Sequence, residues 1–108
     1  MGQPQARLGD FSMGHWVSIF YFPPVPLVEA SLDTLSCCIN ASRVGDAAAP
    51  HFAWIYGVIP LPSYIHDPIA ETGSTEKFIN ELPAFRVEDN YDCGDTQAQG
   101  CEENLVGG

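Results

Sequence analysis

Basic residues are scarce in this 108-residue chain: four Lys and Arg stand against 14 Asp and Glu, and none of the four follows Arg86. The resulting net charge of −10 argues against nucleic-acid binding and against binding to anionic lipid surfaces, because both present negative charge. A charged protein partner should therefore be basic. Long apolar runs are also missing, so we expect no membrane span, which needs about 20 apolar residues.

The chain lacks any recognisable catalytic, metal or cofactor motif. It has no C-x-x-C pair. Ser63, His66 and Asp67 lie close in sequence, but no nucleophile elbow surrounds the serine. Glu88–Asp95 is as rich in carboxylates as a calcium loop, but its glycine and final glutamate are out of register for an EF-hand. We therefore expect no cofactor and a non-catalytic protein rather than an enzyme.

Aromatic and β-branched residues are concentrated in two related stretches. Trp16–Leu27 reads WVSIFYFPPVPL, and His51–Pro62 reads HFAWIYGVIPLP; the two align with a shift of 36 residues, which places Trp16 over Phe52. Each begins as an apolar run typical of a buried strand and ends in prolines, which cannot continue a central strand. The sequence predicts two similar strands that lie side by side.

His15 and His51 occupy equivalent positions, just before these two stretches. On neighbouring strands the two imidazoles could be bridged by a metal ion. The local sequence offers no third ligand, so we predict ordinary polar strand ends and no metal site.

The spacing of apolar residues changes to a helical one between the two stretches. Val28, Leu32, Leu35 and Ile39 follow one another at intervals of 4, 3 and 4, which predicts a helix within Leu27–Val44. Ser74 or Thr75 could cap a second, short helix through Leu82. In residues 84–88, apolar and charged side chains alternate, which is the pattern of a half-buried edge strand. The predicted fold class is α+β, a small single domain in the order β-α-β-α-β.

We expect three regions along the chain. Residues 1–14 lack periodicity and should form a flexible arm or a leader. Residues 15–88 should form the α+β domain. Residues 89–108 are acidic and nearly without apolar residues, so they should be a disordered tail unless cysteines hold them to the domain.

Four cysteines, an even number in a short chain, permit a disulfide framework: Cys37, Cys38, Cys93 and Cys101. Adjacent cysteines rarely bridge each other, so Cys37 and Cys38 should each pair with one of the distant thiols. Four cysteines allow three connectivities, and the sequence does not choose between the two that pair Cys37 and Cys38 with distant thiols.

A secreted form of the protein is a second hypothesis. Arg7 and the apolar stretch Trp16–Val28 could serve as a signal peptide that is cleaved before Ser31. Asn40 begins an N-A-S glycosylation sequon, which has meaning only in the secretory pathway. The sequence does not decide between a secreted and a cytoplasmic location.

The last four residues, Leu105-Val106-Gly107-Gly108, resemble the diglycine ends of ubiquitin-like modifiers and sulfur carriers. They are also similar to the Leu-x-Gly-Gly sequences that papain-like viral proteases cut. The first resemblance implies a conjugation or sulfur-transfer terminus at Gly107 and Gly108. The rest of the chain departs from the ubiquitin-like order of elements, which begins with a hairpin.

The favoured hypothesis is a small acidic accessory protein that binds another protein. Its contact surface would be the proline-rich segments that follow the two aromatic stretches, because such segments can bind as preformed extended ligands. The predicted partner contacts are Pro23, Pro24, Pro60 and Pro62.

Overall fold

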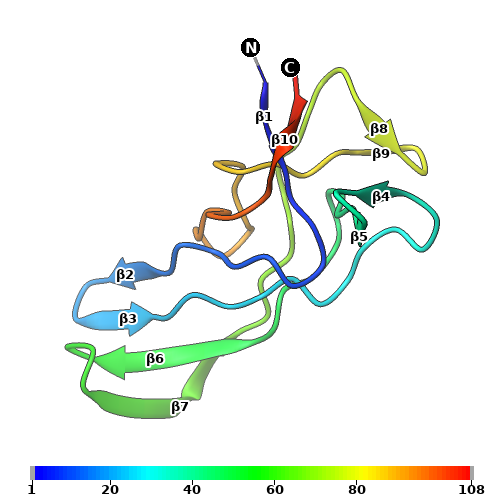
Figure 1. The fold of residues 1–108 in the computed structure, drawn as a ribbon. Coiled ribbons are helices and arrows are strands. Elements are labelled where there is room, and N and C mark those ends of the chain that lie inside the picture. The colour runs from blue at the N-terminus through cyan, green and yellow to red at the C-terminus, as the bar shows by residue number, and fades with distance from the viewer. Residues whose placement is uncertain (1, 108) are drawn as a thin grey trace.

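The regular elements in residues 2–107 of the computed structural model are all β-strands (Figure 1). The expected α+β order is therefore wrong: none of the described residues is helical, and no helix that could span a membrane is found among them. The strands are β1 (Gln3–Gln5), β2 (His15–Val17), β3 (Phe20–Phe22), β4 (Leu35–Ser36), β5 (Ile39–Asn40), β6 (His51–Ile55), β7 (Ile59–His66), β8 (Phe78–Ile79), β9 (Leu82–Pro83) and β10 (Cys101–Val106).

The two aromatic stretches do lie side by side, in an antiparallel sheet of order β2-β3-β6-β7. Phe20 pairs with Ile55 and Tyr21 with Trp54 across β3 and β6. Each stretch is a hairpin rather than a single strand, because the chain reverses at Ser18 and again at Tyr56, both with positive φ. We call residues 11–28 and 47–66, which contain this sheet and its turns, the aromatic lobe, and the other described residues the body.

Prolines do not end the second aromatic stretch as expected. Pro60 and Pro62 lie inside β7, which is an edge strand of the sheet. Proline is tolerated in an edge strand because the backbone N–H groups on its outer side have no neighbouring strand to bond to. Proline at an edge also discourages pairing with a strand of another chain.

The predicted helix within Leu27–Val44 is wrong. The four residues of its apolar stripe are all exposed, Leu32 to 96%. The Ser31 hydroxyl accepts hydrogen bonds from backbone N–H groups two and three residues later, which creates a turn that competes with a helix. The chain then forms the β4–β5 hairpin, whose two turn residues, Cys37 and Cys38, have φ of 50° and 67°.

The predicted short helix after Ser74 is wrong for the same reason. Ser74 does accept hydrogen bonds from the backbone N–H groups of Glu76 and Lys77, as a helix cap would. The chain then reverses at Asn80 and Glu81, with φ of 52° and 69°, and forms the β8–β9 hairpin. A capping interaction therefore marks a turn here, not a helix start.

Three copies of one turn give the body of the molecule a pseudo-threefold arrangement. Each copy is an Arg-x-x-Asp segment in which the Arg backbone N–H and guanidinium both donate to the Asp carboxylate. All three arginines of the chain are used in this way. The pairs are Arg7–Asp10, Arg43–Asp46 and Arg86–Asp89.

The residues before these arginines close a ring of backbone hydrogen bonds. Ala6 N–H donates to Phe85 O at 2.9 Å, Phe85 N–H to Ser42 O at 3.1 Å, and Ser42 N–H to Ala6 O at 2.9 Å. The side-chain amide of Gln5 lies against the ring, with Nε2 within 3.0 Å of all three carbonyl oxygens. Gln5 is fully buried, so this ring is the centre of the body.

Three short antiparallel pairs surround this ring: β4–β5, β8–β9 and β1–β10. The first two are hairpins, whereas the third joins the first strand of the chain to the last (Figure 1). Parts of the expected flexible arm and acidic tail are therefore paired strands of the body: Gln3–Gln5 forms β1 and Cys101–Val106 forms β10.

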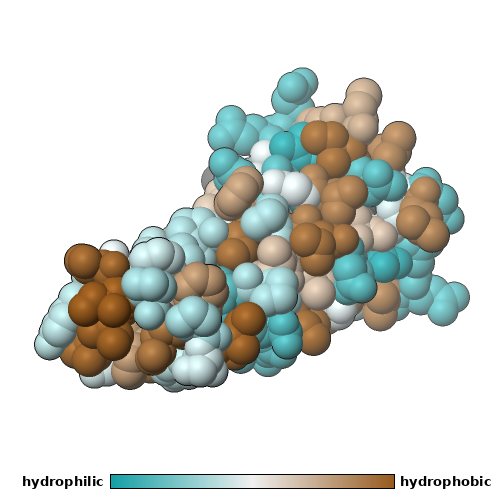
Figure 2. Space-filling view, turned by 90° about the horizontal axis from the view of Figure 1, so that it is seen from below, coloured by the Kyte–Doolittle hydropathy of each residue, from teal (hydrophilic) through white to brown (hydrophobic). Residues whose placement is uncertain are grey.

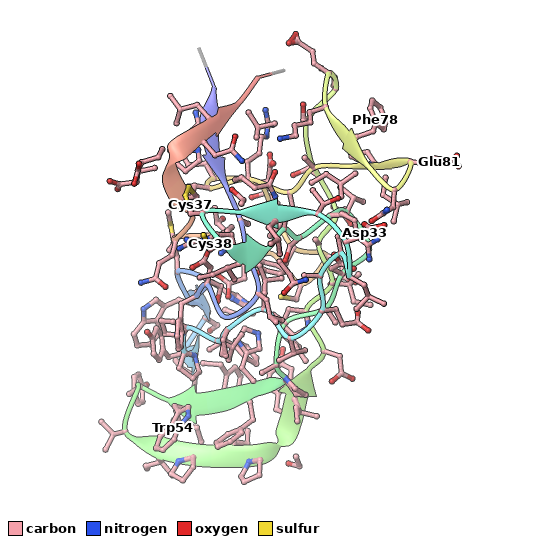
Figure 3. All side chains as sticks on the ribbon, turned by 45° about the vertical axis from the view of Figure 1, so that its right-hand side comes forward. Asp33, Cys37, Cys38, Trp54, Phe78 and Glu81 are labelled. Atoms are coloured by element: carbon pink, nitrogen blue, oxygen red, sulfur yellow. A yellow bond between two sulfur atoms is a disulfide. The ribbon has the colours of Figure 1, made fainter. Side chains whose placement is uncertain are left out.

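The charged side chains of the molecule lie in the body and not in the aromatic lobe. Residues 11–28 and 47–66, which build the aromatic lobe, contain no Asp, Glu, Lys or Arg. Figure 2 shows hydrophobic residues gathered at the end of this lobe, and Figure 3 places Trp54 there, away from Asp33 and Glu81 on the body. The exposed apolar residues of the lobe's end include Trp16, Val17, Ile19, Tyr56, Val58 and Ile59.

Candidate metal centre

Four potential metal ligands meet where the aromatic lobe joins the body. His15 begins β2, His51 begins β6, His66 ends β7, and Cys93 lies in the loop between the third Arg-x-x-Asp turn and β10. Antiparallel pairing places His51 opposite His66. One ligand atom from each of the four residues lies within 4.8 Å of the others.

The spacing of these atoms suits a tetrahedral ion. Cys93 Sγ lies 3.8 Å from His51 Nε2. For a Zn²⁺ ion with usual bond lengths and tetrahedral angles, the sulfur and nitrogen should be about 3.6 Å apart. This pair therefore has nearly the spacing of a tetrahedral site, and the cluster as a whole, whose ligand atoms lie within 4.8 Å of one another, would contract around an ion.

Several of the nitrogen atoms are buried without a hydrogen-bond partner in the described part of the chain. They are both ring nitrogens of His15 and Nδ1 of His66. Buried polar atoms are almost always hydrogen-bonded, since leaving one unsatisfied costs about 1–3 kcal/mol. A bound ion would coordinate one nitrogen of each ring, and the other nitrogen of His15 would then need a separate acceptor.

Asp95 adds a buried negative charge beside the cluster. Its side chain is fully buried, and its Oδ2 also has no hydrogen-bond partner among the described residues. That oxygen lies 3.8 Å from His15 Nδ1 and 4.0 Å from His51 Nδ1. A buried carboxylate needs a positive charge nearby, and the chain's three arginines are paired with other aspartates.

Backbone and aromatic contacts fix the orientation of the imidazoles. His51 Nδ1 lies 3.0 Å from the Pro23 carbonyl, so a proton there would leave Nε2 as the metal ligand. Phe22, fully buried, stacks on His66 and on His15 with ring centroids 4.0 and 4.9 Å apart. The rings are thus held in place by packing against Phe22 and against one another, with the His15 and His66 rings stacked at 5.7 Å between centroids.

The protonation states favour metal binding. Burial lowers the pKa of His15 and of His66, so that both rings are neutral ligands at neutral pH. For His66, the nearby His51 lowers the pKa further. Burial raises the pKa of the Cys93 thiol, so its deprotonation depends on a positive ion in the cluster.

The sequence predicts no metal site, although it shows the equivalence of His15 and His51, both of which lie in the cluster. It gives no reason to group His66 or Cys93 with them. The bulge in the β6–β7 pairing brings His66 opposite His51, and no spacing rule reveals it.

The structure forms one of the two expected disulfides. Cys37 pairs with Cys101, whereas Cys38 and Cys93 are free thiols. Because Cys93 belongs to the histidine cluster, its free state agrees with a role as a metal ligand.

The remaining candidate residues are spread over the molecule. Asn40 lies in β5, where its side-chain amide donates to Ser31 O at 2.7 Å; glycosylation there remains a prediction. The Gly107 carbonyl accepts hydrogen bonds from Ser74 and Arg86, and Gly108 lies outside the described residues. The predicted partner contacts, Pro23, Pro24, Pro60 and Pro62, belong to the aromatic lobe.

Comparison with known proteins gives no family for the chain: no family model matches it, and neither does any curated protein.

Proposed function

We propose that this chain is a non-catalytic interaction protein whose aromatic lobe is stabilised by one structural Zn²⁺ ion. The observation that carries this proposal is the cluster of His15, His51, His66 and Cys93 beside the buried carboxylate of Asp95. These five side chains leave several polar atoms unsatisfied without an ion. A bound cation would coordinate one nitrogen of each imidazole and offset the charge of Asp95, while the second nitrogen of His15 faces the Asp95 carboxylate.

Zn²⁺ is the ion that best matches three imidazoles and one thiolate. Mg²⁺ and Ca²⁺ prefer oxygen ligands, which the cluster does not supply in sufficient number. Four protein ligands complete a tetrahedral shell and leave no open position for a substrate or a reactive water. The role of the ion is therefore structural.

The ion would link segments that are distant in sequence. The four ligands come from β2, β6, β7 and the loop before β10. The hydrophobic core of this small chain is rich in alanine, with only a few large side chains such as Phe85 and Tyr91. Metal binding then contributes directly to folding, as it does in other small domains.

The body offers a repeated contact surface for a partner. Leu35, Phe78 and Leu105 occupy equivalent positions in its three strand pairs, and they are 61%, 56% and 56% exposed. Exposed apolar side chains contribute little to folding, so their repetition indicates binding. Three equivalent contacts suit a protein partner with a threefold axis, and the net charge of −10 favours a basic one.

Metal analysis of the purified protein tests the first part of the proposal. We expect one Zn²⁺ per chain by native mass spectrometry. Replacement by Co²⁺ should give a thiolate-to-metal charge-transfer band and the absorption of a tetrahedral site. Cys93→Ser should abolish the charge-transfer band, and Cys38→Ser should retain it because Cys38 is an exposed thiol outside the cluster. A protein that folds fully without metal would contradict the proposal.

Partner capture tests the second part. A triple variant with serine at Leu35, Phe78 and Leu105 should lose the partner that the native chain binds. A control triple variant removes equally exposed apolar residues from the lobe: Val17, Val58 and Ile65. Native mass spectrometry of the complex should show three partner subunits for each chain. One partner subunit per chain would contradict a threefold partner.

A further inference from the structure

The third strand pair of the body is closed differently from the other two. In the β4–β5 and β8–β9 hairpins a two-residue turn joins the strands. In the third pair, β1 and β10 are the first and last strands of the chain, and no turn connects them. Their association therefore depends on the contacts that β10 makes.

The ladder between β1 and β10 is irregular. Three residue pairs join the strands in the described chain, against two in each hairpin, but the register shifts between Pro4 and Gln5. Pro4 has no N–H to donate to the ladder. Glu102 and Glu103 are both exposed, so the middle of β10 adds no buried surface.

Contacts to the rest of the body hold the far end of β10. Val106 is buried in a cluster with Ala41, Ile79 and Ala84. Asn104 donates to the Ser36 hydroxyl at 2.7 Å, and Arg86 donates to the Gly107 carbonyl at 3.0 Å. These contacts link β10 to both neighbouring strand pairs.

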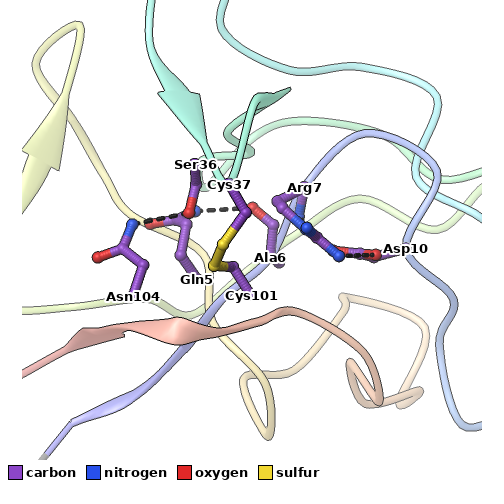
Figure 4. Close-up of a disulfide and its surroundings, with 8 residues drawn as sticks. All are labelled: Gln5, Ala6, Arg7, Asp10, Ser36, Cys37, Cys101 and Asn104. Carbon is purple, nitrogen blue, oxygen red and sulfur yellow. Dashed lines mark hydrogen bonds and ion pairs between the residues drawn. A yellow bond between two sulfur atoms is a disulfide. The ribbon is translucent and has the colours of Figure 1, made fainter.

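Apart from the backbone itself, the disulfide is the one covalent link between β10 and another part of the described chain. It joins Cys101, the first residue of β10, to Cys37 in the turn between β4 and β5 (Figure 4). Cys101 is buried, whereas Cys37 is exposed. A reductant can therefore reach the bond from the Cys37 side.

We propose that the Cys37–Cys101 disulfide is a redox-operated clasp that keeps β10 closed against β1. A thiolate of a dithiol reductant attacks Cys37 Sγ, and the Cys101 sulfur leaves as a thiolate that takes up a proton. The second thiol of the reductant then attacks the mixed disulfide, so Cys37 regains its thiol and the reductant becomes a disulfide. Two electrons and two protons pass from the reductant to the protein.

Reduction opens only the third strand pair. With the covalent link removed, β10 separates from β1 more often, and the edge of β1 becomes available to another strand. The aromatic lobe stays folded because its sheet and its histidine cluster contain neither Cys37 nor Cys101. This inference is independent of the metal and of the threefold partner.

Hydrogen exchange measured by mass spectrometry tests the clasp. The experiment uses the full chain with Cys38→Ser, so that the neighbouring thiol cannot exchange with the disulfide. A phosphine reductant avoids dithiol chelation of the metal; it takes oxygen from water and yields the same two protein thiols. Amides of residues 102–106 should exchange at least tenfold faster after reduction, whereas those of β6 should be unchanged.

A variant that also carries Cys37→Ser provides the matched control. It should show fast exchange in residues 102–106 without reductant, and the reductant should have no further effect. Equal exchange of β10 in the oxidised and reduced protein would overturn the clasp. So would equal acceleration of β6, because the disulfide would then hold the whole fold rather than one strand.

Discussion

The Asp95 carboxylate lies 3.8 Å from His15 Nδ1, and neither atom has a hydrogen-bond partner among the described residues. In metal sites a carboxylate beside an imidazole commonly accepts its free N–H and directs the other nitrogen to the ion. The first prediction follows from this pair.

Asp95→Asn should weaken Zn²⁺ binding about 10- to 100-fold, because the amide removes the compensating charge and orients His15 less firmly. Competition with a chromophoric chelator measures this change. The charge-transfer band of the Co²⁺ form should persist, since Cys93 and the three imidazoles remain. Asp67→Asn removes an exposed charge next to His66 and serves as the control, with unchanged affinity.

Glu88→Gly should stabilise the protein by about 1 kcal/mol. Glu88 has φ of 76°, and the equivalent turn residues Gly9 and Gly45 have φ of 86° and 96°. A side chain is strained in this region, whereas glycine is not. Thermal unfolding should show an increase of a few degrees in Tm.

Gly45→Ala is the reverse experiment. A Cβ at Gly45 would meet no atom within 4 Å, so any loss reflects backbone conformation alone. We expect about 1 kcal/mol of destabilisation. A stabilised Gly45→Ala protein, or a destabilised Glu88→Gly protein, would show that the three turns are not equivalent.

Gln5→Met should destabilise the body by about 1–3 kcal/mol. Methionine has a similar size but cannot donate to the carbonyls of Ala6, Ser42 and Phe85. Urea unfolding measures the change. Gln99→Met provides the control, since Gln99 Oε1 accepts only one exposed hydrogen bond, from Phe11 N–H, and its loss should cost much less.

Asn80→Gly should raise the pKa of Asp33. The Asn80 amide is the main cause of the lowered Asp33 pKa, and the Ser31 hydroxyl adds to it. A lowered folded-state pKa gives stability that is present above the unfolded-state pKa and is lost as pH falls through the folded-state value. In the variant, the stability contributed by ionised Asp33 should therefore fall less as the pH drops near and below pH 4. Carboxyl NMR titration measures the raised pKa of Asp33.

Glu81→Gly is the control for that titration. It changes the neighbouring turn residue, which has φ of 69°, but keeps the Asn80 amide. The Asp33 pKa should stay where it is in the native protein. A shift equal to that of Asn80→Gly would mean that turn conformation, rather than the amide, sets the pKa.

The hairpins could not be predicted because their turns lack the usual signature. The pairs Cys37-Cys38 and Asn80-Glu81 adopt positive φ without glycine, although Asn-Gly or Asp-Gly is the usual signal. The helical spacing in Leu27–Val44 was accidental, since the residues that share it face solvent. The sequence does contain a sign of the pseudo-threefold arrangement, because Arg-x-x-Asp occurs three times, at Arg7, Arg43 and Arg86.

The sequence by itself determined the pairing of the two aromatic stretches and the equivalence of His15 and His51. Both follow from local composition, because apolar β-branched and aromatic runs form strands and adjacent similar strands pair. It also determined that a disulfide was available to a chain with four cysteines.

Only the tertiary structure decided the metal centre and the closed body. His66 and Cys93 reach His15 and His51 through strand register and loop placement, and β1 meets β10 across the whole length of the chain. These contacts join residues far apart in sequence. They are stabilised by the burial of side chains and by the ring of backbone hydrogen bonds at the centre of the body. Local sequence patterns do not encode such long-range contacts.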